Sequence, residues 1–199
     1  MKYPSTFLLG VDEAGRGPLA GPVAVGVVKV PVGFDIRRAF PGVNDSKQLS
    51  ESERESIYIE MLGRVRLEEI SFCVRMSSAA TIDRIGITKA VRHGVWNGVR
   101  SLAPNPTNVR VLLDGLLHAP AEYEQETIIK GDALEPVISL ASIAAKVRRD
   151  RFMKQLAKKY PNYLLDIHKG YGTKRHYEAI EKWGISDIHR RSFLGLTTP

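Results

Sequence analysis

Two adjacent carboxylates, Asp12 and Glu13, lie between an apolar run and a glycine-rich segment. The apolar run at 7–11 is typical of a buried strand, and the glycines of the Ala-Gly-Arg-Gly segment at 14–17 allow a backbone to approach a ligand closely. Acids beside such a turn suggest a metal site. For a single Asp-Glu pair, the plainer interpretation is a tight turn whose acids are solvated, so other residues must decide.

A similar arrangement recurs twice later in the chain. Asp114 ends the apolar run at 109–113, and Asp132 follows Gly131. Ordinary turns do not require an acid next to a glycine at the ends of three separate apolar runs. Four carboxylates in one cleft would repel one another unless cations joined them. Oxygen ligands without cysteine favour Mg²⁺ or Mn²⁺, and two such ions about 4 Å apart can activate a water for phosphodiester hydrolysis. We therefore expect one metal-binding, catalytic site formed by Asp12, Glu13, Asp114 and Asp132.

Two familiar glycine-rich motifs fit this segment poorly. A dinucleotide fingerprint, G-x-G-x-x-G, opens a helix, whereas Gly15, Gly17 and Gly21 have a longer last spacing and lead into an expected strand. Gly10 and Gly15 have the spacing of a phosphate-binding loop, but Arg16 follows in place of lysine. Neither nucleotide-binding motif is therefore predicted.

The elements expected around these residues alternate between strands and helices. Strands are expected at 6–12, 21–30, 65–76, 109–114 and 126–129, and helices at 78–84, 86–102, 136–160, 174–183 and from Ser50, which opens a capping box. This order predicts one α/β domain over 1–199 with its site at the ends of neighbouring strands, and 160–199 as a basic helical extension packed on it. Adjacent strand residues point to opposite faces, so a bulge or the strand end must bring Asp12 and Glu13 together.

Charge and composition narrow the class of protein. The formal net charge is +7, and residues 130–199 hold 14 of the 29 Lys and Arg but only 7 of the 22 Asp and Glu. Such an excess favours binding of nucleic acid, although a merely solvated basic surface is an equal alternative. Cys73 is the only cysteine, and no stretch approaches the roughly 20 apolar residues of a membrane span. We expect a cytoplasmic protein with no membrane association.

Seven segments carry a specific resemblance. They are VDEAGRGPLAGPV near the start, NDSKQLSESERE at 44–55, LLDG at 112–115, IKGD at 129–132, ASIAAKVRRDR at 141–151, HKGYGT at 168–173 and IHRRSF at 188–193. In these segments the chain resembles bacterial ribonuclease HII, the type 2 ribonuclease H, in the family's order and over nearly its whole length. The resemblance implies an α/β fold of the ribonuclease H type, in which helices flank a central mixed sheet and the C-terminal part is helical.

The resemblance also implies an activity. It is endonucleolytic cleavage of RNA in RNA/DNA hybrids and incision 5′ of a single ribonucleotide in duplex DNA, which would start ribonucleotide excision repair by a monomeric enzyme. The family's metal ligands fall on the same four acids. Gly15, Arg16 and Gly17 match the loop that recognises the 2′-hydroxyl and flanking phosphates. Tyr171 matches the tyrosine that packs on the sugar at the junction, and Lys47 matches a site lysine.

One position departs from the family pattern. Many members have a lysine two residues after the last acid, where this chain has Leu134 followed by Glu135. An alternative enzyme would therefore cleave long hybrids without preference for single ribonucleotides. A non-catalytic hybrid-binding module is a further alternative, which the acids disfavour because they would repel phosphate.

Other residues of the C-terminal part allow two interpretations. His168, His176 and His189 could contact phosphates or make structural hydrogen bonds, and Arg190 could contact a phosphate or be solvated. Trp183 is expected in the core.

Overall fold

A five-stranded sheet is the central layer of the computed structural model, which describes residues 6–43 and 49–196. Its strands are β1 (Phe7–Ala14), β2 (Val23–Pro31), β3 (Ser71–Ser77), β4 (Val109–Asp114) and β5 (Glu124–Ile128), in the spatial order β3-β2-β1-β4-β5. β1 pairs antiparallel with β2 and parallel with β4, and β4 pairs parallel with β5. The expected central mixed sheet is therefore confirmed.

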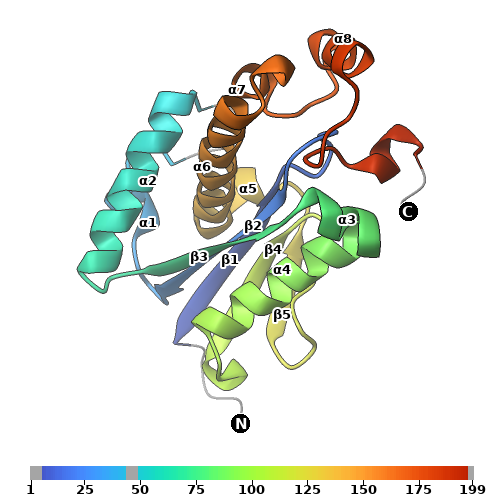
Figure 1. The fold of residues 1–199 in the computed structure, drawn as a ribbon. Helices are drawn as coiled ribbons and strands as arrows, with labels where there is room; N and C mark the ends of the chain where they lie inside the picture. Colours follow the sequence, from blue (N-terminus) through green and yellow to red (C-terminus); the bar gives the residue numbers. More distant parts are fainter. Residues whose placement is uncertain (1–5, 44–48, 197–199) are drawn as a thin grey trace.

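Helices cover both faces of the sheet (Figure 1). One face carries α1 (Ile36–Ala39), α2 (Glu51–Arg66) and α6 (Pro136–Lys159), and the other carries α3 (Ala79–Ile85) and α4 (Ile87–Leu102). The short α5 (Gly131–Leu134) follows β5, and α7 (Leu165–His168) and α8 (Lys174–Trp183) lie at one end of the sheet. In the part of the chain that the structure describes, no helix has the length and apolar character needed to cross a bilayer.

Alternation along the strands divides the core between the two faces. Leu9 and Val11 of β1 pack with Val95 of α4 in one buried cluster. Val28 of β2 and Leu140 of α6 belong to the cluster on the opposite face. Because successive strand residues point to opposite sides, one sheet supplies apolar side chains to both layers.

Two glycines let α6 lie unusually close to the sheet. A Cβ atom at Gly10 would come within 2.2 Å of the Val137 carbonyl oxygen, and one at Gly26 within 2.1 Å of the Ala141 oxygen. Real Cβ atoms do not approach a backbone so closely, so only glycine permits this packing. The small residues early in α6 therefore bring Ser142 down to the end of β1.

The expectation of a strand from residue 65 was wrong at its beginning. α2 continues to Arg66, and β3 begins only at Ser71. The Ser50–Glu53 capping box starts α2 as expected, with the Ser50 N–H 2.7 Å from Glu53 Oε2. The alternating apolar residues at 65–67 fit the last helical turn equally well, and Glu68, with a φ of 58°, ends the helical path.

A third buried cluster joins the C-terminal helices to the rest of the protein. Ala20, which follows β1, and Met153 of α6 pack there with Leu165, Ala179 and Ile188. Trp183, expected in the core, is instead 52% exposed at the end of α8. The 3.6-residue period of the sequence correctly predicted a helix at Trp183, but it did not show which face of that helix is covered.

Candidate active site

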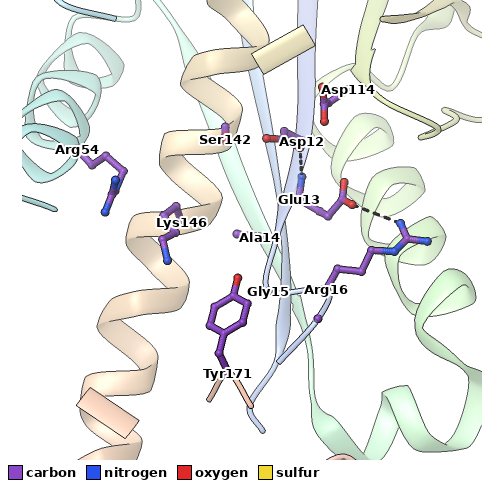
Figure 2. A pocket seen from close by; sticks show the side chains of 11 residues that line it. Asp12, Glu13, Ala14, Gly15, Arg16, Arg54, Asp114, Ser142, Lys146 and Tyr171 are labelled. Carbon is purple, nitrogen blue, oxygen red and sulfur yellow. Dashed lines mark hydrogen bonds and ion pairs between the residues drawn. The ribbon is translucent and has the colours of Figure 1, made fainter. Parts of the chain in front are cut away.

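The ends of two parallel strands bring three of the predicted acids together. Val11 of β1 is the register partner of Leu113 of β4, so the residues that follow lie at the same edge of the sheet. Asp12, Glu13 and Asp114 line one pocket there (Figure 2). The sequence-based prediction of a site at neighbouring strand ends agrees with this placement.

Asp12 is the most enclosed acid of the pocket. It is 5% exposed and its Oδ1 accepts the Glu13 backbone N–H at 2.7 Å. Burial, together with the nearby Asp114 and Glu13 carboxylates, raises the pKa of the Asp12 carboxyl to about 8, although the hydrogen bond with Ser142 of α6 acts in the opposite direction. A bound cation would offset this penalty, so the chemistry of the pocket fits a cation site.

Glu13 lies on the other side of β1, as strand alternation requires. The pairing of β1 with β2 runs from Phe7 to Ala14 without a bulge, so the strand end and not a bulge places both acids in one pocket. Figure 2 shows Asp12 directed toward Ser142 and Glu13 toward Arg16, whose Nη1 lies 3.3 Å from Glu13 Oε1. Burial raises the pKa of Glu13, and the Arg16 charge opposes that rise.

Asp132 approaches the site from α5 and not from a strand. Its backbone N–H donates to Asp114 Oδ1 at 3.4 Å, and its side chain is 2% exposed. It does not line the pocket that contains the other three acids. Within residues 6–43 and 49–196, no three Asp, Glu, His or Cys side chains converge closely enough to hold a metal ion as they stand.

The glycine-rich loop after β1 forms the next wall of the pocket. Gly15 has a φ of +85°, and a Cβ atom there would lie 1.9 Å from Arg149 Nε. Both the conformation and the close approach therefore require glycine. Gly15, Arg16 and Gly17 all line the pocket, and the last two are exposed.

Arg190 holds this loop from beneath and was missed as a site residue. Its side chain is fully buried, and its Nη2 and Nη1 donate to the carbonyl oxygens of Gly15 and Arg16 at 2.7 and 2.8 Å. In a trans peptide the C=O and the next N–H point in opposite directions. The N–H groups of Arg16 and Gly17 are thus turned away from the interior. Arg190 therefore neither contacts a phosphate nor is solvated.

Arg149 supports the later part of the same loop, near Pro22. It is fully buried, and its Nε donates to the Pro22 carbonyl at 2.9 Å while Nη2 donates to the Lys169 carbonyl at 3.0 Å. Burial, with the Arg149 charge nearby, lowers the pKa of Arg190 to about 9, so that guanidinium remains charged at neutral pH. Buried backbone carbonyls in a glycine-rich loop need donors, and the two arginines supply them.

The remaining wall carries an aromatic ring and two cations. Tyr171 is 42% exposed and lines the pocket, with the Arg149 guanidinium 5.9 Å from its ring centre. Arg54 of α2 and Lys146 of α6 also line the pocket and were not predicted (Figure 2). Lys47, a predicted site residue, lies outside the described residues.

Comparison with known proteins shows the family of this chain. A model of the ribonuclease HII family matches residues 9–195. A protein described as Ribonuclease HII from Bacillus cereus (strain B4264) is 46% identical over 188 residues, which cover 94% of this chain and 69% of that protein.

Solved structures show the same fold. The ribonuclease H2 of Pyrococcus horikoshii OT3 has a TM-score of 0.73 and 27% identity, over 94% of this chain and 93% of that one. Bst-RNase HIII in complex with Mn²⁺ has a TM-score of 0.67 over 91% of this chain and 64% of that one, and at 19% identity it shares the fold alone. By the family match and the identity to its relatives, this chain belongs to the ribonuclease HII family and is a ribonuclease H, a hydrolase.

Proposed function

We propose that this protein is a divalent-metal-dependent endoribonuclease that cleaves the RNA strand of RNA/DNA hybrids and incises 5′ of single ribonucleotides in duplex DNA. The observation that carries the proposal is one pocket that joins Asp12, Glu13 and Asp114 to the Gly15–Gly17 loop and Tyr171. A non-catalytic binding module gains nothing from three carboxylates facing a phosphate backbone. Membership of a ribonuclease family supports the catalytic alternative.

Asp12, Glu13, Asp114 and Asp132 would hold Mg²⁺ or Mn²⁺. When bound, two such ions supply an activated water and stabilise the leaving oxygen of the phosphodiester. The raised pKa of Asp12 and of Glu13 supports this role, because carboxylates that are costly to ionise alone bind a cation favourably. The Mn²⁺ complex of Bst-RNase HIII, which shares this fold, is consistent with it.

The opposite wall of the pocket would recognise the ribonucleotide. The outward N–H groups of Arg16 and Gly17 suit phosphate oxygens or a 2′-hydroxyl, which alone distinguishes RNA from DNA there. Tyr171 would pack on the sugar at the junction, and Lys47 would contact a phosphate. We further propose that the protein acts as a cytoplasmic monomer in ribonucleotide excision repair, with 160–199 as an extension of a single domain.

A second function, hybrid cleavage without preference for single ribonucleotides, is favoured by one observation. Leu134, two residues after Asp132, is 61% exposed and places an apolar side chain where many family members carry a lysine. One phosphate contact would thereby be absent, which would weaken binding of a duplex near the scissile bond.

The decisive experiment is cleavage of a labelled DNA duplex that contains one ribonucleotide, beside a continuous RNA/DNA hybrid. Both substrates are tested with Mg²⁺, Mn²⁺ or chelator, for the wild type, Asp132→Asn and the matched control Asp35→Asn. Asp35 is an exposed helix cap, and asparagine caps equally well. We expect metal-dependent incision 5′ of the ribonucleotide by the wild type and by Asp35→Asn. Asp132→Asn should not make this incision.

Other outcomes of this experiment separate the alternatives. Cutting of the long hybrid alone would favour broad specificity. Binding of both substrates without cleavage would overturn the enzymatic proposal.

A further inference from the structure

Three histidines gather in the interior behind the segment that carries Tyr171. His168 ends α7, His176 lies in α8, and His189 follows α8. His176 and His189 are 0% and 2% exposed, and the His176 ring stacks on His168 with ring centres 4.4 Å apart. Rings so deeply buried do not reach phosphates. The role of these histidines must therefore lie in their hydrogen bonds within the protein.

The proton position on His176 follows from its partner. Its Nδ1 lies 2.9 Å from the Tyr171 carbonyl oxygen, which only accepts hydrogen bonds, so Nδ1 carries the proton. In a neutral ring Nε2 is then an acceptor. It lies 3.2 Å from His189 Nε2, which must therefore be protonated and donate.

The hydrogen bond at the other nitrogen of His189 leads to the same proton positions independently. The Ser186 backbone N–H lies 3.0 Å from His189 Nδ1 and only donates, so this Nδ1 is unprotonated. A neutral His189 consequently carries its proton on Nε2. Two separate backbone groups, the Ser186 N–H and the Tyr171 carbonyl, thus require one arrangement of the two ring protons.

An additional proton would break the chain. If the Nε2 atoms of His176 and His189 both carried a proton, two N–H groups would face each other across 3.2 Å. Burial lowers the pKa of His176, and burial with the adjacent His176 lowers the pKa of His189 to about 4 in spite of the nearby Asp187 carboxylate. Both rings are therefore neutral at pH 7, as the hydrogen bonds require.

We propose that the hydrogen bonds from the Ser186 N–H through His189 and His176 to the Tyr171 carbonyl form a chain of fixed direction that positions Tyr171 in the pocket. This inference rests on the proposed role of Tyr171 at the junction sugar. The Thr173 N–H shares the same carbonyl at 2.8 Å, and Arg149 lies under the Tyr171 ring. His176 and His189 are thus positioning residues, which act on substrate through Tyr171.

The first test reads the protons directly on the wild-type protein. Long-range ¹H–¹⁵N correlation spectra of the ¹⁵N-histidine-labelled protein at pH 7 report which ring nitrogen is protonated. We expect His176 protonated at Nδ1 and His189 at Nε2. A His176 ring protonated at Nε2, or at both nitrogens, would overturn the proposal whether or not the protein cleaves RNA.

The second test measures function with matched variants. In His176→Asn an amide can donate to the Tyr171 carbonyl, whereas in His176→Leu nothing can; His118→Leu, at an exposed histidine, is the control. For the single-ribonucleotide duplex we expect KM to rise about tenfold in His176→Leu with kcat changed less than threefold, as expected of lost positioning. His176→Asn should recover most of this loss. Equal losses in the two variants would contradict the proposal.

A double variant separates positioning of Tyr171 from a general structural role. In a Tyr171→Ala background, His176→Leu should not raise KM further, because the ring it positions is gone. Additive effects would overturn the proposal. If the wild type did not cleave the single-ribonucleotide duplex, the proposed function would fail, while the spectra would still report the direction of the chain.

Discussion

The two sides of the pocket handle charge in opposite ways. On the strand side, Asp12, Glu13 and Asp114 bring three carboxyl groups together, and Arg16 forms an ion pair with Glu13. On the loop side, Arg149 and Arg190 bury two positive charges against backbone carbonyls. The acids of the strand side can bind a cation, whereas the arginines of the loop side donate hydrogen bonds that fix the backbone.

This difference shows that the basic excess of residues 130–199 is not all available to nucleic acid. Arg149, Arg190 and the buried histidines instead make hydrogen bonds to the backbone of the segments beside the pocket. Three cations line the pocket; Arg16 and Arg54 precede residue 130, and Lys146 of α6 belongs to the basic excess. A count of basic residues therefore overstates the charge that meets a phosphate backbone.

The largest expected effect breaks the acidic side. Asp12→Asn should lower kcat by about 10³-fold, because a metal ligand is lost. It should also stabilise the chelated protein by about 1–3 kcal/mol near pH 8, since it removes a buried carboxylate with neighbours of the same sign. Single-turnover cleavage and urea unfolding measure the two quantities. A parallel loss of both would show that Asp12 supports the fold instead.

The next effect breaks the loop side. Arg190→Met should destabilise the protein by about 3–4 kcal/mol, because it leaves the buried Gly15, Arg16 and Gly21 carbonyls without their donor. Arg191→Met, at the exposed neighbour, should change stability by less than about 0.5 kcal/mol. Chemical denaturation provides the comparison. Similar losses in both variants would contradict the role assigned to Arg190.

The smallest effect sharpens the comparison through pH. The folded-state pKa of His189, about 4, lies below its usual value, so the unfolded chain takes up the proton first. Its contribution to stability is present above about pH 6.5 and is lost as the pH falls to about 4, by at most about 3 kcal/mol.

Asp12 has the opposite sign over much of this range. Its raised pKa lets the folded state hold the proton more strongly, so stability rises as the pH falls from about 8. Unfolding free energies in chelator should therefore fall more steeply toward pH 4 in Asp12→Asn than in the wild type. Parallel curves would show that the two regions do not oppose each other.

The sequence was sufficient for those features that depend on neighbours along the chain. Acids after apolar runs located Asp12, Glu13 and Asp114 at strand ends, and the capping box located the start of α2. Asp132 was expected after a strand, and it lies in α5 because Lys130 takes a left-handed conformation that turns the chain. No residue type announces that turn, since lysine rarely adopts it.

Features that depend on tertiary burial could not be read in this way. Arg190 and Arg191 are adjacent and chemically identical, yet one is fully buried and the other exposed. The difference arises from the loop of β1, more than 160 residues earlier, whose carbonyls the Arg190 side chain satisfies. The same holds for His176 and His189, whose pairing depends on how α8 packs.

The path of α6 has a consequence for where the phosphodiester bond is cut. Ser142, beside Asp12, and Arg149, beneath Tyr171, lie on this one helix, seven residues or about 10 Å apart along its axis. Gly10 and Gly26 hold the first half of that helix directly on the sheet. If the protein acts as proposed, the spacing between the reacting phosphate and the junction sugar would thereby be constant, and incision would fall at a fixed offset from the ribonucleotide in any sequence.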